Sequence, residues 1–203
     1  ADKAKLKALQ WRISAWKSAL VEPNAALSLA EDDLGLAAAR LYGDYEQALR
    51  AYQAVDFDDL IRLPVRLFES EADVLLRWQG KLQYLLVDEY QDTNRSQYRL
   101  LRLLAGERAA FTAVGDDDQA IYAWRGADVE NLRVLQADFP QLKVIKLEQN
   151  YRSMQRILKA ANALIGNNEK LFEKRLWSEH GHGDAVQVNV ARDNEQEAEQ
   201  VVM

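Results

Sequence analysis

Two adjacent acidic residues, Asp88 and Glu89, directly follow the apolar run 82–87. Ligands of α/β proteins bind beyond the carboxyl ends of the strands, so such a pair can face a ligand crevice. One carboxylate can then hold a hydrated Mg²⁺ ion while the other orients or deprotonates a water molecule. The alternative is a solvated loop after a core strand, where acidic pairs are common. The residues alone leave both interpretations open.

A second apolar run, 111–114, is followed by a loop that combines Gln119 with aromatic and basic residues. A glutamine can detect a phosphate oxygen by hydrogen bonding without adding charge. Tyr122 and Trp124 can stack on nucleobases, and Arg125 lies beside them for a phosphate or cation–π contact. The alternative is that both aromatic side chains anchor the loop in the core, as most aromatic residues do.

A third polar segment follows the predicted strand 142–147 and contains Tyr151 and Arg152. An arginine directly before a helix cap, here Ser153, can reach a γ-phosphate and compensate its charge in the transition state. Tyr151 can stack on a base. The alternative for Arg152 is a surface ion pair with one of the many acidic residues of the chain.

Three consecutive aspartates, Asp116, Asp117 and Asp118, also suggest a metal-dependent hydrolase. This is the weaker interpretation, because consecutive residues rarely converge on one ion and no histidine has a suitable spacing. His180 and His182 lie in a glycine-containing segment that is typical of a connector.

The elements that would position these residues alternate between strand and helix from Lys81 onward. Strands are predicted at the two apolar runs and at 142–147, and a weaker strand is predicted at 185–190. Helices are predicted from cap and stop residues over 94–106, 128–139 and 153–166, and from about Asn194. Short strands that alternate with helices are typical of a parallel α/β sheet.

Residues before about 80 carry only helical signals. Trp11 and Trp16 lie near helical spacing in a basic segment. An Ala-rich amphipathic helix is predicted over about 27–55. A third helix opens at Asp56, and Pro64 is expected to limit or kink it. We therefore expect an all-helical segment in front of the α/β part.

Composition excludes several classes of protein. The 203 residues are 48% hydrophobic and 29% charged, which excludes disorder and collagen-like repeats. There is no cysteine, so a disulfide framework, a thiol nucleophile and a thiolate metal site are excluded. No apolar run approaches the ~20 residues of a membrane span and no signal-peptide pattern is present, so we expect a cytoplasmic protein without membrane contact. The net charge of −6 does not by itself indicate nucleic-acid binding.

The polar segments together resemble motifs II, III and IV of the superfamily 1A helicases, the UvrD, PcrA and Rep group. The motifs are, in order, LLVDEYQDTN (85–94), VGDDDQAIYAWRGA (114–127) and LEQNYRS (147–153). DFDDLI (56–61) also fits this group, and residues 143–165 with FEKRLWSE (172–179) are most similar to the Rep type. The resemblance covers essentially the whole chain, though it is vague before about residue 50.

The resemblance implies part of a RecA-like P-loop NTPase fold, a parallel sheet with helices on both faces. It assigns 1–55 to the end of subdomain 1B, 56–147 to the second part of motor domain 1A, and 148–203 to motif IV and the start of motor domain 2A. The chain contains no G-x-x-x-x-G-K-[ST], the loop that holds the phosphates. We therefore expect a middle piece of a longer helicase, with the phosphate loop upstream and the later motifs downstream.

The resemblance also implies a role for each residue near the nucleotide. Asp88 coordinates Mg²⁺, and Glu89, at the same metal site, activates the attacking water. Gln91 couples the ATP site to its surroundings. Gln119 contacts the γ-phosphate and links it to the DNA-binding loop.

For the remaining residues the resemblance implies contacts with DNA or with the far side of the nucleotide. Tyr122 and Trp124 stack on bases of single-stranded DNA, and Arg125 lies on the same track. Tyr151 stacks near the adenine of ATP, and Arg152 contacts the γ-phosphate from the border of the two motor domains.

The function implied is that of an ATP-dependent 3′-to-5′ single-stranded-DNA translocase and helicase in replication or repair. ATP and Mg²⁺ would be its cofactors. Its partners would be single-stranded DNA, 3′-tailed duplex DNA and replication or repair proteins. Without the phosphate loop, we expect the chain alone to lack ATPase activity. The alternative from a different class is a non-catalytic module that binds single-stranded DNA or a protein.

Overall fold

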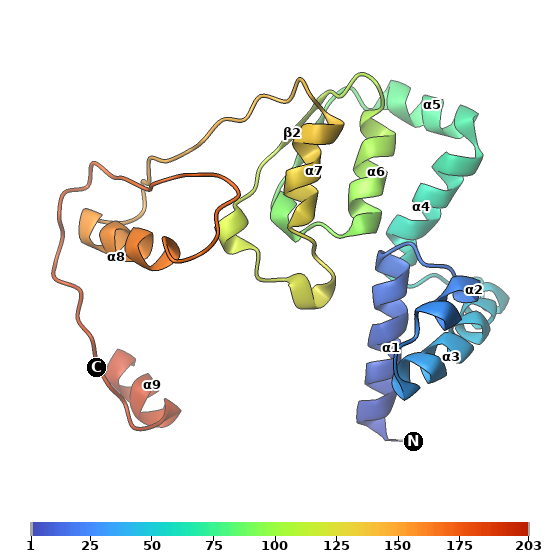
Figure 1. The fold of residues 1–203 in the computed structure, drawn as a ribbon, viewed down its shortest axis with the longest axis horizontal. Coiled ribbons are helices and arrows are strands. Elements are labelled where there is room, and N and C mark those ends of the chain that lie inside the picture. The colour runs from blue at the N-terminus through green and yellow to red at the C-terminus, as the bar shows by residue number, and fades with distance from the viewer. Residues whose placement is uncertain (1, 203) are drawn as a thin grey trace. The chain divides into compact units, whose positions relative to one another are not determined.

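A computed structural model describes residues 2–202 of the chain (Figure 1). The chain forms two compact units, Ala1–Leu142 and Lys143–Met203, which are described separately below. No helix among the described residues is long and apolar enough to cross a membrane.

The first unit begins with a helical bundle. Its elements are α1 (Lys3–Ser18), α2 (Pro23–Ala26), the short 3-10 helix η1 (Leu27–Leu29) and α3 (Asp33–Ala51). Asp2 caps α1 and Asp32 caps α3, because each carboxylate accepts a hydrogen bond from a first-turn amide. One side of α1 packs against α3, where Trp16 stacks on Tyr42 with ring centroids 6.2 Å apart. The predicted all-helical segment is therefore present.

Two further helices, α4 (Asp59–Ser70) and α5 (Ala72–Lys81), connect the bundle to the sheet. Pro64 lies inside α4, and the helix continues beyond it to Ser70. Of the two expected effects, that Pro64 limits or kinks this helix, the first is therefore wrong.

Seven ionisable side chains form a network that joins α1, α3 and α4. Lys17 is fully buried, and its Nζ lies 3.0 Å from Glu46, 2.6 Å from Asp56 and 2.9 Å from Asp59. Arg62, also fully buried, lies 3.0 Å from Glu46 and 3.2 Å from Asp59. The rest of the network consists of Glu22, which pairs with Arg62, and Arg66, which pairs with Glu22.

The pKa values in this network follow from the pairing. Burial alone lowers the pKa of Lys17, but its hydrogen bonds to Asp56, Asp59 and Glu46 outweigh burial and raise it. Burial alone raises the pKa of Asp56, yet the hydrogen bonds from Lys17, the Asp59 amide and Tyr45 lower it overall. The acids that open the third predicted helix are therefore counter-ions of a buried lysine.

The sheet consists of β1 (Leu85–Val87) and β2 (Phe111–Ala113), which pair in parallel. Between them lie the 3-10 helix η2 (Tyr90–Asp92) and α6 (Arg95–Ala105). The cap that the sequence predicts at Asn94 is a full capping box with Gln97, and Gly106 ends the helix. After β2 follow η3 (Asp117–Gln119), η4 (Ala123–Arg125) and α7 (Glu130–Asp138).

One face of this sheet is covered by α6 and α7, which lie side by side (Figure 1). Phe111 packs between them with Leu101 and Leu135, and Tyr98 and Arg102 of α6 both contact Asp138. On the opposite face Leu86 is 80% exposed. Within the described residues the fold is thus a helix-rich α/β arrangement with a two-stranded parallel sheet. The expected larger sheet with helices on both faces is not seen there.

The second unit contains α8 (Gln155–Ile165) and α9 (Asn194–Val202). The predicted strands at 142–147 and 185–190 are not formed. A strand needs a neighbouring backbone for its hydrogen bonds, and the described residues provide only an isolated bridge between Gln149 and Trp177. Accordingly Leu147 is 80% exposed and Val188 is 87% exposed.

Candidate functional site

Asp88 and Glu89 lie directly after β1, as the sequence predicts. Both are exposed, and both line an open cavity of about 450 Å³ whose other walls include leucines of α6. Asp88 Oδ1 accepts a hydrogen bond from the Glu89 amide at 2.9 Å. Glu89 adopts a left-handed conformation with φ of 47°, which costs a non-glycine residue about 1–3 kcal/mol. This backbone turn presents two carboxylates on one loop.

Gln91 connects this loop to the loop that follows β2. Its side chain is almost fully buried. Its Nε2 donates to Glu89 Oε2 at 2.8 Å, and its Oε1 accepts from the backbone amide of Asp116 at 3.0 Å. Because one end of the amide donates and the other accepts, both partners fix its orientation.

Gly115 allows the two loops to approach this closely. A Cβ atom at this position would lie 2.9 Å from Gln91 Oε1 and 3.3 Å from the Gln91 backbone nitrogen. The parallel ladder also continues past the strands, since the Tyr90 amide donates to the Val114 carbonyl at 2.9 Å. The close contact between the loops is therefore a backbone feature as well as a side-chain one.

The hydrogen bonds continue from Asp116 to Gln119. Asp116 Oδ2 accepts from Gln119 Nε2 at 2.7 Å, and Asp116 Oδ1 accepts from the Asp118 amide at 3.1 Å. A chain of hydrogen bonds thus runs from Glu89 through Gln91 and Asp116 to Gln119. Four residues that the sequence places in two motifs are joined in one network.

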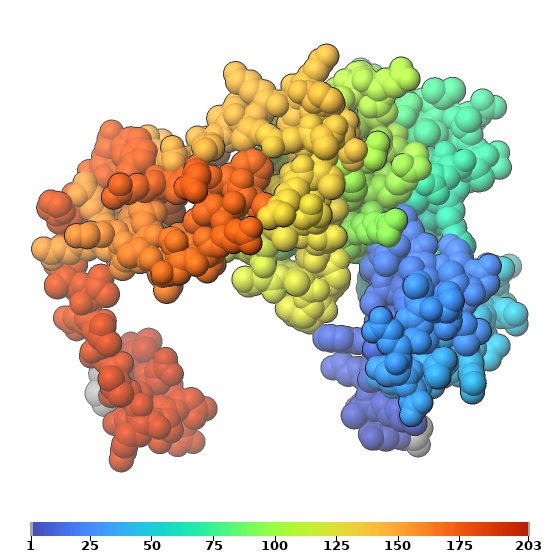
Figure 2. Space-filling view, in the orientation of Figure 1, coloured from blue at the N-terminus to red at the C-terminus, as the bar shows by residue number. Residues whose placement is uncertain are grey.

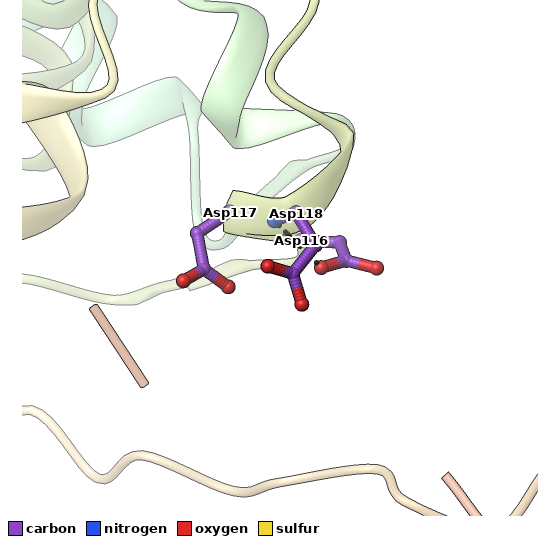
Figure 3. A group of neighbouring side chains, drawn as sticks. All are labelled: Asp116, Asp117 and Asp118. Atoms are coloured by element: carbon purple, nitrogen blue, oxygen red, sulfur yellow. Dashed lines mark hydrogen bonds between the residues drawn. The ribbon is translucent and has the colours of Figure 1, made fainter. Parts of the chain in front are cut away.

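The three aspartates of this loop are drawn in Figure 3. One carboxylate oxygen from each of Asp116, Asp117 and Asp118 lies within 4.8 Å of the others, a spacing that a metal ion could bridge. The carboxylate of Asp116 is already engaged by Asp118 and Gln119. An acidic cluster of this kind is common on protein surfaces, and we assign it no metal.

The aromatic residues of the same loop lie on the surface. Tyr122 is 37% exposed and Trp124 is 55% exposed, so the interpretation that they anchor the loop in the core is wrong. The guanidinium carbon of Arg125 lies 5.1 Å from the Tyr122 ring centroid and 4.6 Å from that of Trp124. Flat, exposed rings beside a cation suit base stacking.

Trp11 of α1 also belongs to this group of exposed aromatic residues, although the sequence indicates only that it lies on a helix. Its ring stacks on Trp124 with centroids 5.7 Å apart and planes inclined by 20°. In the space-filling view the loop after β2, in yellow-green, lies next to the blue α1 (Figure 2). No spacing rule relates residues 113 positions apart, so only the tertiary structure reveals the pair.

Tyr151 and Arg152 belong to the second unit. The Tyr151 hydroxyl donates to Gln149 Oε1 at 2.9 Å. The backbone carbonyl oxygen of Tyr151 lies 2.7 Å from Nε2 of the His180 ring. Asn150 caps the turn, because its Oδ1 accepts from the amides of Arg152 and Ser153. The side chains of Tyr151 and Arg152 are exposed. His180 thus has a structural contact within the segment interpreted as a connector.

The donor set at the end of β1 fits Mg²⁺. Oxygen ligands are what this ion prefers, and it is commonly held by one or two carboxylates together with phosphate oxygens. Asp88 is exposed, and among residues 2–202 its only hydrogen bond is the one to Oδ1. Its second oxygen is therefore open to a ligand.

Comparison with known proteins gives matches over nearly the whole chain. Residues 1–140 match the family model of the UvrD/REP helicase N-terminal domain, and residues 145–203 match that of the UvrD-like helicase C-terminal domain. The ATP-dependent DNA helicase Rep of Escherichia coli K12 is 56% identical over 200 residues, which is 98% of this chain and 30% of the relative.

Two further relatives match most of this chain as well. Rep of Salmonella typhimurium is 54% identical over 98% of this chain and 30% of its own length. The ATP-dependent DNA helicase PcrA of Leuconostoc citreum is 44% identical over 92% of this chain and 25% of its own length. The chain therefore spans less than a third of each relative, and its greater identity to these Rep proteins agrees with the Rep-type motifs.

Proposed function

We propose that this chain, which belongs to the UvrD/REP helicase family, carries part of the ATP site and part of the DNA track of an ATP-dependent DNA helicase. In the full-length protein it would drive 3′-to-5′ translocation on single-stranded DNA and unwinding of 3′-tailed duplexes, in replication or repair. The observation that carries the proposal is the hydrogen-bond chain from Glu89 through Gln91 and Asp116 to Gln119.

At the nucleotide end, Asp88 would hold Mg²⁺ and Glu89 would accept a proton from the attacking water. The bound ion would neutralise charge on the transferred phosphoryl group. The hydrogen bond from Gln91 orients the Glu89 carboxylate and leaves its other oxygen available to a water. Gln119, at the end of the same chain, would contact the γ-phosphate.

At the DNA end, Tyr122 and Trp124 would stack on bases and Arg125 would support the same track. Only two residues separate Gln119 from Tyr122, so a displacement of Gln119 on binding or release of the γ-phosphate would reach the aromatic loop directly. This short connection gives a physical route by which the state of the nucleotide changes the grip on DNA.

The second unit would supply Tyr151 near the adenine and Arg152 at the γ-phosphate. Arg152 is exposed, as a residue that reaches a ligand on another domain must be. We accordingly propose that 1–55 belongs to subdomain 1B, 56–147 to a RecA-like motor domain 1A, and 148–203 to motif IV and the start of motor domain 2A. Closure of the two motor domains on ATP would then bring Arg152 to the phosphate.

The proposal is tested on the chain by titrating a fluorescently labelled oligothymidylate at two salt concentrations. Trp124→Ala is expected to weaken binding about tenfold, because stacking on an aromatic ring contributes about 1–3 kcal/mol per base. Trp78→Ala is the matched control, since Trp78 is also exposed beside a cation, Lys81, but lies on α5. Equal binding by both variants would contradict the DNA-binding assignment.

ATP turnover by the chain alone is the second arm of this test. Since its sequence lacks G-x-x-x-x-G-K-[ST], we expect no hydrolysis with or without DNA. DNA-stimulated hydrolysis by the purified chain would contradict this.

A further inference from the structure

Trp11 and Trp124 form an exposed aromatic pair that the proposed function does not explain. Both rings are about half exposed, at 52% and 55%, although they stack on one another. A pair that served only to pin a loop to a helix would bury more of its surface. Stacked in this way, the two side chains still leave about half of their surface to solvent.

The position of Trp11 on α1 is set by helical geometry. The buried side of α1 carries Leu9, Ile13 and Trp16. At 100° per residue, Trp11 lies on the opposite side of the helix. Ser18, two turns further on, lies on the same side and faces Gly126 of the aromatic loop, at 3.9 Å from the Cβ position of that glycine. The outward side of α1 is therefore the side that meets the loop.

Two lysines extend this side of α1 away from the loop. Lys7 lies one turn before Trp11, and Lys3 lies one turn before Lys7. Both are exposed, and neither has a carboxylate within ion-pair distance among residues 2–202. Arg12, by contrast, pairs with Asp32 at 3.3 Å and lies on a different side of the helix from Lys3, Lys7 and Trp11.

The spacing of the rings determines how a base would meet them. A base inserted between two rings needs about 7 Å, twice the contact distance of carbon atoms. The Trp11 and Trp124 centroids are 5.7 Å apart, so the pair is closed to insertion. A strand stacked on Trp124 would therefore continue across the outside of Trp11, towards Lys7 and Lys3.

We propose that Trp11 is a further stacking residue for single-stranded nucleic acid, and that Lys7 and Lys3 bind the phosphates of the same strand. This inference rests on the proposed DNA contact of Trp124 and extends it onto α1. The chemistry of these residues indicates the ligand. Aromatic rings can stack on bases, and cations at one-turn intervals can bind the phosphates of the same strand. These local cations would act within a protein whose net charge is −6.

The test measures binding of labelled oligothymidylate by the chain, with thermal unfolding as a check on folding. Trp11→Ala is expected to weaken binding about tenfold. Trp11→Tyr, which keeps a ring, is expected to restore most of it. Trp78→Ala, as above, is expected to bind like the wild type.

A double variant separates direct stacking from mere support of Trp124. If Trp11 contacts a base itself, Trp11→Ala weakens binding further in a Trp124→Ala background. If it acts only by holding Trp124, the second substitution adds nothing, and the inference is wrong. If Trp11→Ala alone binds normally while Trp124→Ala binds weakly, the inference fails and the proposed function stands.

The lysines provide a second test that does not require substitution of either tryptophan. Lys7→Ala is expected to reduce the slope of log K against log salt by about 0.7, the loss of one phosphate contact on a single strand. Lys5→Ala is the control, because Lys5 lies about 160° around the helix from Lys7. Equal slopes for the two variants would contradict the phosphate assignment. If Trp124→Ala itself has no effect, the proposed DNA contact is wrong, and the inference fails with it.

Discussion

The side-chain oxygen of Gln91 accepts a hydrogen bond from the backbone amide of Asp116 at 3.0 Å. This bond joins the loop after β1, which carries the paired carboxylates, to the loop after β2, which leads to the exposed aromatic residues. Both loops belong to one compact unit. The proposed communication between nucleotide and DNA therefore passes through a contact of two residues 25 positions apart.

Gly115→Ala is expected to disrupt this contact. Its new Cβ would lie 2.9 Å from Gln91 Oε1 and 3.3 Å from the Gln91 backbone nitrogen, so the buried Gln91 side chain must move away from the Asp116 amide. We expect a loss of about 1–3 kcal/mol in the free energy of unfolding, as for a buried polar group left without its partner. The measurement is urea unfolding of the chain.

Gly43→Ala is its matched control. Gly43 lies inside α3, and a Cβ there would meet nothing within 4 Å. Alanine in a helix interior should stabilise the chain by about 1 kcal/mol. Similar stability changes for the two variants would show that Gly115 is not needed for close approach.

Lys17→Met is expected to destabilise the chain by about 3 kcal/mol, because it leaves buried carboxylates without their cation. Asp56 would lose the one cationic partner that residues 2–202 give it, while Arg62 would still hold Glu46 and Asp59. Arg12→Met serves for comparison, since Arg12 forms an exposed pair with Asp32 and should change stability by less than about 1 kcal/mol. Urea unfolding of both variants gives the answer, and equal losses would contradict the structural role of Lys17.

The stability that Asp56 provides should depend on pH. The pKa of Asp56 lies below its ordinary value of 3.8 in the folded chain, chiefly because hydrogen bonding to Lys17 outweighs the effect of burial. A lowered folded pKa gives a contribution that is present above pH 3.8 and is lost as the pH falls through the folded pKa. The stability difference between the wild type and Asp56→Asn should thus be constant above about pH 5 and shrink below about pH 4. A difference that stays constant into acid would contradict the pairing.

Glu89→Gln in the full-length protein is expected to abolish ATP turnover while ATP binding remains. The amide keeps the shape of the side chain but cannot accept the proton of the attacking water. Turnover and nucleotide affinity are measured separately, with Glu107→Gln, an exposed residue after α6, as the control. Retained turnover would refute the assignment of Glu89 as the base.

Local features of the fold could be predicted from the sequence, and long-range ones could not. The capping box at Asn94 and the glycine that ends α6 are local, so their residues suffice to predict them. The positions of Asp88 and Glu89 after β1 likewise follow from a short apolar run. Four of the six residues at 142–147 are apolar, but a strand also requires a partner, which the described residues do not supply.

The contacts within the candidate site depend on tertiary structure. Nothing local indicates that Gln91 is buried, because its partners come from a second loop whose position depends on the register of β1 and β2. The pairing of Trp11 with Trp124 and that of Lys17 with Asp56 are of the same kind. Motif resemblance implies which residues form the candidate site, and the structure shows which of these residues are in contact.

The most direct test of the account is the effect of Gln91→Met on coupling in the full-length protein. The substitution keeps the length of the buried side chain and removes its hydrogen bonds to Glu89, to Asp92 and to the Asp116 amide. The quantity to measure is the ratio of the Kd values for single-stranded DNA with and without a non-hydrolysable ATP analogue. We predict that the variant still binds the analogue and DNA but that this ratio falls to about one. A ratio unchanged from the wild type would contradict the proposal that Gln91 couples the two sites.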